Sequence, residues 1–242
     1  MNTSLFQTVI LAGGFGTRLR PLTDSQPKPM VKISGRPYLE YQLLWLKQSG
    51  AKEVLLLVSY LGSKIMNHFK DGSSFGLTIK YSVEKEPMGT AGALKNAERY
   101  LDDRFFLING DSFLPVPLQD IQNAYLSKTR KGMVVVYDNA ADTLVRNNIS
   151  LDRSDIVLKY RKGTQDRDLK YVDAGIGVYD KEILSLIPAK GSVSFENEIY
   201  PLLIERKELA AYKTKQRFYD IGTFEQLKRF SEFANSYFTG LD

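Results

Sequence analysis

The chain has 242 residues, of which 33 are lysine or arginine, 28 aspartate or glutamate and one histidine, giving a formal net charge of +5. The hydrophobic content of 43% is typical of a folded globular protein, and no apolar run approaches the roughly 20 residues that cross a bilayer. The absence of cysteine excludes disulfides and Cys-ligated zinc, and a single His68 argues against a Ser-His-Asp hydrolase. We therefore expect a cytoplasmic protein without a membrane partner.

The positive charge is mild and scattered along the chain. The densest short basic groups, at residues 128–131 and 213–217, are interpreted as solvated surface. Nucleic acid is therefore not an expected partner, although a small anionic substrate would suit this charge.

The first half of the chain alternates short apolar runs with segments of helical periodicity. The pattern predicts strands at residues 8–12, 53–58, 77–83 and 104–109. It predicts helices between them, at residues 37–48 (with Pro37 in the first turn), 63–69 and 91–100. This alternation indicates an α/β fold with a Rossmann-like, mainly parallel mixed sheet flanked by helices, because parallel neighbours need crossover connections.

The pattern changes after a strand predicted at residues 132–137. Short strands and polar turns, including residues 156–160 and 172–179, indicate a small β-rich insertion over residues 140–178. Helices are predicted near residues 196–206 and 224–237, with a strand near residues 217–221 between them. No linker or repeat interrupts the chain, so we expect one domain over residues 1–242.

A glycine-rich loop, residues 13–19, directly follows the first predicted strand. Ligands of open parallel sheets bind beyond the carboxyl ends of the strands, and glycines let backbone N–H groups approach phosphate oxygens. Arg18 adds a cation suited to phosphate. The loop is neither a dinucleotide fingerprint, since Leu19 replaces the third glycine, nor a P-loop. Alone, it predicts either a phosphate site or a simple turn.

The segment that follows makes the pattern specific. Lys28 lies between Pro27 and Pro29, whose fixed φ angles stiffen the backbone. Residues 13–29 match Gly-Gly-x-Gly-Thr-Arg-Leu-x-Pro-Leu-Thr-x-x-x-Pro-Lys-Pro at every fixed position. The chain therefore resembles the sugar-1-phosphate nucleotidyltransferases, which join a nucleoside triphosphate to a sugar 1-phosphate and release pyrophosphate. The resemblance continues at residues 35–37, 89–93, 109–111 and 220–223.

The resemblance implies a site that needs no histidine or cysteine base, because the sugar phosphate is itself the nucleophile. Arg18 and Lys28 would offset charge on the reacting phosphates, with Lys28 in an open cleft. Asp111 and Asp220, both at strand ends, would hold Mg²⁺, although loop capping is the alternative for each aspartate. The implied nucleotide contacts are Leu11, Ala12, Gly13, Gly14, Gly16, Thr17, Arg18, Glu84, Gly89 and Thr90.

The nucleobase and the sugar are less well defined by the residues. Glu84 could accept hydrogen bonds from guanine or from uracil, and a helix-capping role is the alternative for its segment. The implied sugar-phosphate contacts are Asn109, Lys162, Asp173, Gly175 and Glu196. Two positions depart from the family: Asp173 replaces its Asn, and Arg161 replaces a common Glu, which leaves the role of Arg161 open.

Within the family, the chain looks most like guanylyltransferases that act on D-glycero-D-manno-heptose 1-phosphate or mannose 1-phosphate. We expect GTP, such a sugar 1-phosphate and Mg²⁺ as ligands, with residues 1–138 binding the nucleotide and residues 139–242 binding the sugar and completing the metal site. Homo-oligomerisation is left open. The alternatives are a uridylyltransferase of N-acetylmuramate 1-phosphate or another hexose 1-phosphate, and an inactive module that senses nucleotide sugars.

Overall fold

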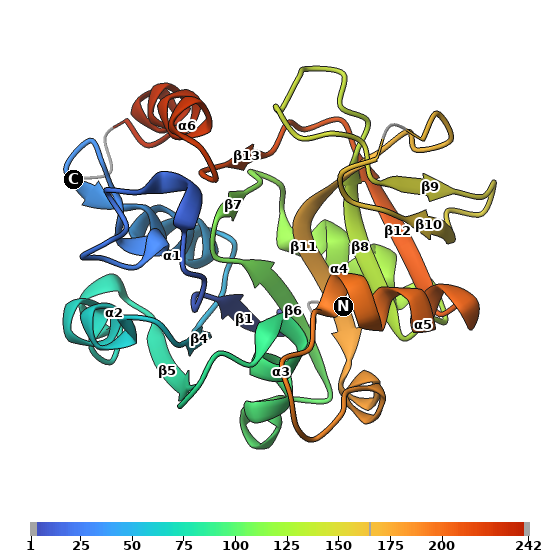
Figure 1. Cartoon of the computed structure of the whole chain (residues 1–242), viewed down its shortest axis with the longest axis horizontal. Coiled ribbons are helices and arrows are strands. Elements are labelled where there is room, and N and C mark those ends of the chain that lie inside the picture. Colours follow the sequence, from blue (N-terminus) through green and yellow to red (C-terminus); the bar gives the residue numbers. More distant parts are fainter. Residues whose placement is uncertain (1–3, 165, 240–242) are drawn as a thin grey trace.

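The computed structural model describes residues 4–164 and 166–239. Its central sheet contains β1 (Gln7–Leu11), β4 (Glu53–Val58), β5 (Thr78–Val83), β6 (Arg104–Asn109), β8 (Gly132–Tyr137), β11 (Val172–Asp180) and β12 (Leu209–Thr214). These seven strands follow the order β12-β8-β11-β6-β1-β4-β5 (Figure 1). β11 is antiparallel to both its neighbours, and all other adjacent pairs are parallel. The expected mainly parallel mixed sheet is confirmed.

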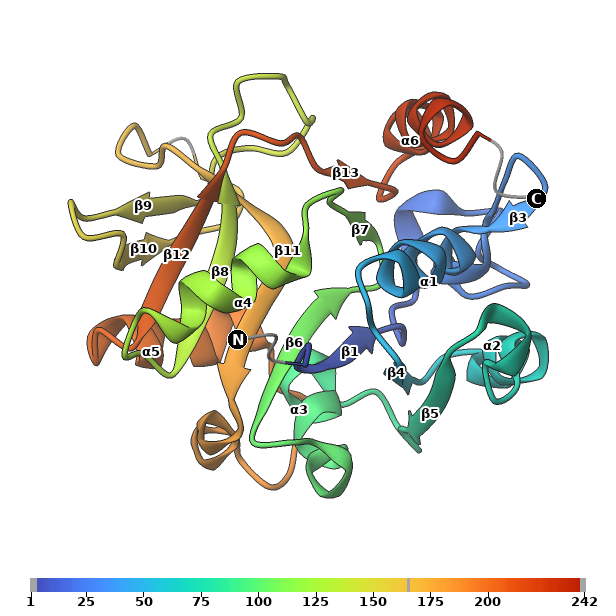
Figure 2. The ribbon, with the colours of Figure 1, turned by 180° about the vertical axis from the view of Figure 1, so that it is seen from behind.

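Both faces of this sheet are buried. Along β6, Phe106 and Ile108 belong to one hydrophobic core, and the alternating Phe105 and Leu107 belong to the other. The first face is covered by α1 (Tyr38–Gln48), α2 (Gly62–Phe69), α4 (Leu118–Leu126) and α6 (Phe224–Tyr237), of which α1 and α4 lie in front of the sheet in Figure 2. The second face is covered by α3 (Gly89–Asn96) and α5 (Tyr200–Glu205).

Three pairs of short strands lie outside the central sheet. They are β2 (Lys32–Ile33) with β3 (Arg36–Pro37), β7 (Ser112–Phe113) with β13 (Tyr219–Asp220), and β9 (Ile149–Leu151) with β10 (Val157–Tyr160). The pair β9-β10 forms the small β-rich insertion and projects from the flank opposite α2 (Figure 1). No helix of the described residues is long and apolar enough to span a membrane.

Several elements differ from the sequence-based expectation. β11 is a central strand rather than part of the insertion, because its alternating buried side chains pack into both cores. The expected helix at residues 196–206 is a π-helical turn, Phe195–Ile199, followed by the short α5. Pro37 precedes the first turn of α1 as its N-cap instead of lying within it. α4 and β12 had no counterpart in the prediction.

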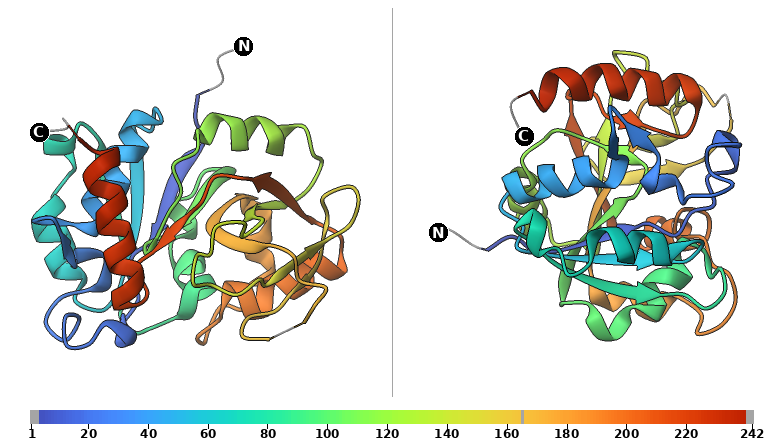
Figure 3. Two further views of the ribbon diagram at one scale, coloured as in Figure 1. Left: turned by 90° about the horizontal axis from the view of Figure 1, so that it is seen from above. Right: turned by 90° about the vertical axis from the view of Figure 1, so that its left-hand side faces the viewer.

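The last helix, α6, holds the C-terminal part of the chain against α1 (Figure 3). Phe230 of α6 packs edge-on against Tyr38 and Tyr41 of α1, with ring centroids 4.9 and 5.7 Å apart. Tyr219, in β13, stacks on Phe233 of the same helix at 4.2 Å. This aromatic packing fixes β13 beside β7, and it thereby brings Asp220 to the carboxyl end of the sheet.

Candidate active site

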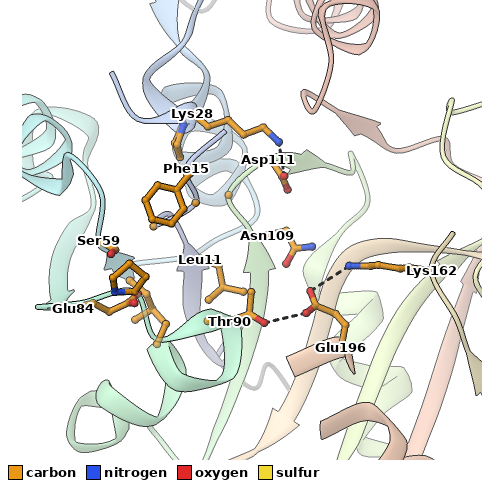
Figure 4. A pocket seen from close by; sticks show the side chains of 18 residues that line it. Leu11, Phe15, Lys28, Ser59, Glu84, Thr90, Asn109, Asp111, Lys162 and Glu196 are labelled. Atoms are coloured by element: carbon orange, nitrogen blue, oxygen red, sulfur yellow. Dashed lines mark hydrogen bonds and ion pairs between the residues drawn. The ribbon is translucent and has the colours of Figure 1, made fainter. Parts of the chain in front are cut away.

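A cavity of about 310 Å³ lies beyond the carboxyl ends of β1, β4 and β6 (Figure 4). Eleven residues singled out from the sequence line it: Leu11, Gly13, Gly14, Lys28, Glu84, Gly89, Thr90, Asn109, Asp111, Lys162 and Glu196. Some of the residues expected at the nucleotide, at the sugar phosphate and at the metal therefore line one common space. Ala12, Gly16, Thr17, Arg18, Asp173, Gly175 and Asp220 are not among its lining residues.

Further residues line the cavity that were not expected as contacts: Phe15, Pro29, Leu57, Ser59, Pro87, Ala93 and Gly110. Phe15, Pro29 and Gly110 are direct neighbours of motif residues, so the motif itself was their signal. Ser59 follows the last residue of β4, and the rule that ligands bind at strand ends would have found it.

The glycine loop and the Pro-Lys-Pro segment are packed against each other. Gly16 has a φ of +64°, in the left-handed region that favours glycine. A Cβ atom there would lie 2.9 Å from Cβ of Lys28 and 2.9 Å from Cγ2 of Thr23, so only glycine fits. The Thr23 hydroxyl donates a 2.8 Å hydrogen bond to the Gly16 carbonyl. The close approach of Gly16 to Lys28 fixes the Lys28 stem relative to the glycine loop.

Lys28 is buried, which corrects the expectation of a side chain in an open cleft. Only 9% of its side chain is exposed, and its Nζ lies 2.6 Å from Oδ2 of Asp111 (Figure 4). Burial alone would raise the pKa of Asp111, but the charge and hydrogen bond of Lys28, assisted by Lys162 and Arg18, hold that pKa below its ordinary value. Asp111 is therefore an ionised carboxylate at neutral pH.

A second carboxylate lies close to this ion pair. Burial, together with the negative charge of Asp111, raises the pKa of Asp220 to about 6, while Lys28, the Gly222 amide and Arg18 oppose the rise. Asp220 accepts a hydrogen bond from the Gly222 amide. Arg18 is exposed at the rim, yet its Nη2 lies 2.8 Å from where a Cβ on Gly222 would sit. Arg18 and Asp220, which do not line the cavity, thus lie near the Lys28–Asp111 pair, which does.

The two aspartates have the donor chemistry that suits Mg²⁺. This hard cation commonly takes one or two carboxylates, with waters and substrate phosphates as the remaining ligands. The described residues contain no group of three or more His, Cys, Asp or Glu side chains that could hold a metal alone. Asp111 and Asp220 fit a metal that binds together with a phosphorylated ligand, because their mutual repulsion favours a divalent cation between them.

At the other end of the cavity, Glu84 both lines the space and closes a turn. Its carboxylate accepts a 2.9 Å hydrogen bond from the Met88 amide, directly before α3. Burial raises the pKa of Glu84, although this amide opposes the rise. Gly89 has a φ of +72°, and a Cβ there would lie 2.5 Å from the Val193 carbonyl oxygen. Glu84 thus closes the turn before α3, but α3 itself has no side-chain cap, so the structure does not bear out helix capping by this segment.

Glu196 links the two halves of the cavity. Its Oε2 accepts a 3.0 Å hydrogen bond from the hydroxyl of Thr90 at the start of α3, and its Oε1 lies 3.7 Å from Nζ of Lys162 (Figure 4). The Lys162 side chain is 56% exposed and can turn toward a ligand. Arg161, its neighbour, is exposed and is not among the lining residues of the cavity.

Asp173 and Gly175 lie beneath this end, in a narrow adjoining space of about 10 Å³ that Asn109 and Glu196 also line. The Asp173 carboxylate accepts a 2.8 Å hydrogen bond from the Gly175 amide. Burial raises the pKa of Asp173 from 3.8 to about 6, against the effects of the Gly175 amide and Lys162. Asp173 thus belongs to the floor below the cavity.

The sequence of the chain is similar to a family model and to proteins of known name. A family model described as nucleotidyl transferase matches residues 7–236. Mannose-1-phosphate guanylyltransferase of Mycobacterium tuberculosis is 32% identical over 232 residues, covering 95% of this chain but only 64% of that protein. D-glycero-alpha-D-manno-heptose 1-phosphate guanylyltransferase of Campylobacter jejuni is 33% identical over 190 residues, covering 78% of this chain and 83% of that protein.

The structure of the chain is also similar to solved structures. The crystal structure of HddC from Yersinia pseudotuberculosis has a TM-score of 0.80 and 28% identity, covering 95% of this chain and 99% of that chain. The inositol-1-phosphate CTP transferase from T. maritima, at 20% identity and a TM-score of 0.81, shares the fold.

The raised pKa of Asp173 predicts a pH-dependent loss of stability. The carboxyl group ionises near pH 6 in the folded chain but near its ordinary 3.8 when unfolded, so folding favours its protonated form. Its contribution to the free energy of unfolding should fall by up to about 3 kcal/mol as the pH rises from about 4 to about 7, at about 1.4 kcal/mol per pKa unit. Asp173→Asn should lack this component.

Urea unfolding of the ligand-free wild type and Asp173→Asn, measured at several pH values, checks this. Asn keeps an acceptor for the Gly175 amide but cannot ionise, so the variant's stability relative to wild type should rise between pH 4 and 7. A difference that stays constant over this range would contradict the assignment.

Proposed function

Because the chain belongs to the nucleotidyl transferase family, we propose that it transfers a nucleoside monophosphate from a nucleoside triphosphate to a sugar 1-phosphate and releases pyrophosphate. We propose GTP as the donor and D-glycero-D-manno-heptose 1-phosphate or mannose 1-phosphate as the acceptor. The observation that carries the proposal is the buried pair of Lys28 and Asp111, which lies between the glycine loop on one side and Lys162 with Glu196 on the other.

The relatives support the choice of guanine and of the sugar. The two curated relatives described above are both named as guanylyltransferases, one of mannose 1-phosphate and one of the heptose 1-phosphate. A structure of HddC is complexed with GMP-PN and has a TM-score of 0.77 to this chain. Glu84, on the cavity wall, is an acceptor that suits the N–H groups of guanine.

Different residues along the cavity would bind different parts of the two substrates. Backbone amides of Gly13 and Gly14 would receive the triphosphate, while the Arg18 guanidinium at the rim would hold its outer charges. Lys162 would leave Glu196 for the sugar phosphate, since its side chain is already exposed to the cavity. Binding both phosphates here aligns the attacking oxygen with the α-phosphate, so alignment supplies a large part of the rate.

Lys28 would stabilise the charge that develops on the reacting phosphates. Its ammonium group is preorganised by the flanking prolines, by Gly16 and by Asp111, and it has little water to displace. No residue of the described cavity needs to act as a base, because a sugar phosphate is already ionised at neutral pH.

We further propose that Asp111 and Asp220 bind Mg²⁺. When bound, this ion would neutralise phosphate charge and help to orient the α-phosphate. Asp111 would then share its carboxylate between the metal and Lys28, and the proximity of Asp220 supplies the second ligand.

Two other functions remain as outcomes of the tests. A uridylyltransferase of N-acetylmuramate 1-phosphate or another hexose 1-phosphate fits the same geometry, because a carboxylate at position 84 also suits uracil. An inactive module that senses nucleotide sugars is less favoured. Arg18, Lys28, Asp111 and Asp220 are all present and converge, whereas a sensor needs no such arrangement of reactive groups.

The direct test is pyrophosphate release across a matrix of four nucleoside triphosphates and several sugar 1-phosphates with Mg²⁺. We expect the highest kcat/KM for GTP with one of the two manno-configured sugar phosphates. A preference for UTP would select the uridylyltransferase. Binding without turnover for every pair would select the sensory module.

Replacing Lys28 should slow the reaction with little change in ligand affinity. Lys28→Ala should lower kcat by about 10²–10³-fold, the range for removing one preorganised charge donor. The variant should also melt at a lower temperature, because Asp111 loses its partner in a largely buried site. Kinetics normalised to the folded fraction would separate the two effects.

The control is Lys32→Ala, an exposed lysine four residues away. Retention of more than half the wild-type kcat would remove Lys28 from the mechanism.

The metal proposal predicts a loss of cation binding. In the presence of a non-hydrolysable GTP analogue, Asp111→Asn and Asp220→Asn should each weaken Mn²⁺ binding by at least about tenfold, as measured by electron paramagnetic resonance. Asp103→Asn, which changes an exposed aspartate at the opposite end of β6, is the charge-matched control. Unchanged Mn²⁺ affinity in both active-site variants would contradict the assignment.

A further inference from the structure

A second hollow lies at the opposite end of the central sheet from the active-site cavity. Its volume is about 590 Å³, and it lies between the start of β6, the loop from α4 to β8 and the turn from α5 to β12. β6 places Arg104 in this hollow at one end and Asn109 in the active-site cavity at the other. Five residue steps of about 3.3 Å each separate these ends by roughly 16 Å, so the two spaces are distinct.

This hollow concentrates positive charge, and we call it the basic groove. Its cations are Arg104, Lys128, Arg130, Lys131, Arg206 and Lys207. Only two carboxylates, Asp180 and Glu208, also line it. The groove therefore carries an excess of four positive charges, close to the +5 of the entire chain. The sequence alone did not indicate this, because residues 128–131 and 206–207 are far apart along the chain.

The cations of the groove are not equally available. Three are already in ion pairs, those of Arg104 with Asp180, Lys128 with Asp155 and Lys131 with Glu182. The other three are exposed. Within the described residues, Arg206 and Lys207 make no side-chain hydrogen bond or ion pair, and Arg130 donates only to the neighbouring Thr129 carbonyl. Three cations from two facing segments thus have no ion-pair partner within 4 Å among the described residues, although the charge of Lys207 does act on the Asp152 carboxylate.

Helix capping accounts for part of this charge. Basic residues are favoured near helix C-termini, and the basic loops follow α4 and α5 directly. Lys128 behaves as a structural cation of this kind, since its Nζ reaches the Ala211 carbonyl and Asp155. Capping does not explain Arg206 or Lys207, whose side chains bond no carbonyl of the described chain.

We propose that the basic groove binds a small anion with at least two adjacent phosphate groups, either inorganic pyrophosphate or the diphosphate of a nucleotide. Three exposed cations without an ion-pair partner match the three to four negative charges of a diphosphate better than those of a single phosphate. Arg130 approaches from one wall, and Arg206 with Lys207 from the other, which suits a ligand that spans the hollow. Leu126, 45% exposed on the same lining, offers an apolar contact to a ribose or base.

The absence of cysteine makes a local binding assay possible. Thr129→Cys, which lies in the groove lining, would carry one environment-sensitive fluorophore. Asn67→Cys, exposed on α2 at the other flank, would carry the same fluorophore as a control. Each labelled protein is titrated with pyrophosphate, GDP and orthophosphate. At position 129, pyrophosphate and GDP should give saturable fluorescence changes, and orthophosphate should bind at least tenfold more weakly. At position 67, none of the three anions should change the fluorescence. Tighter GDP binding would identify the nucleotide as the source.

Charge variants separate specific binding from general electrostatics. In the Thr129→Cys protein, Arg130→Gln combined with Lys207→Gln should weaken pyrophosphate binding by about tenfold or more, since charge-assisted hydrogen bonds are lost. Arg153→Gln combined with Lys190→Gln removes the same charge from exposed sites outside the groove and should change the affinity less than twofold. Arg18→Ala, which removes the guanidinium proposed to hold the triphosphate at the catalytic cleft, should leave the signal unchanged.

Three results would overturn the proposal. The first is no saturable signal at millimolar pyrophosphate, and the second is equal affinity in the groove and control charge variants. The third is loss of the signal with Arg18→Ala, which would assign the binding to the catalytic cleft.

Discussion

The structure of the cleft depends on the buried ion pair between Lys28 and Asp111. Its partners are 83 positions apart, one in the loop after the first strand and one after β6. A lysine with so little exposure needs a carboxylate beside it, and that carboxylate in turn keeps its negative charge because of the lysine. The glycine loop is then fixed by contact with the Lys28 stem. The negative charge of Asp111 also helps to raise the pKa of Asp220.

The packing of α6 extends this dependence to the C-terminal part of the chain. Phe230 and Phe233 anchor the helix on α1 and on Tyr219, and Asp220 is the next residue. The position of one charged group in the cleft is thus set by an aromatic cluster outside it. Substitutions in that cluster therefore affect the geometry of the site as well as the stability of the fold.

The sequence revealed the features that are local in the chain. Continuous apolar runs located β4, β6 and β8 with their observed bounds, and the glycine and proline motif located most of the cavity wall. α4 was overlooked although Leu118, Ile121, Gln122 and Tyr125 follow the spacing of a buried helical face. β12 contains alanines and polar residues, so its strand character comes from pairing with β8 rather than from its composition.

Features that need distant residues could not be read in this way. The burial of Lys28 depends on Asp111, and the basic groove requires two loops that meet only in the folded chain. The central position of β11 was also hidden, because an alternating strand after an irregular segment reads as a hairpin arm.

That central position of β11 bears on how the chain can acquire its structure. β11 lies between β6 and β8, and β12 is the other neighbour of β8. Until residues 172–180 are available, β6 therefore lacks a neighbour on one side and β8 lacks one on both sides. The first 138 residues emerging from a ribosome would expose these unpaired edges, which invite association with other chains. β11 joins β6 to β8 only after about three quarters of the chain has been made, and β12 completes the sheet later still. The long sequence separation of its central contacts places the protein among the slower-folding topologies.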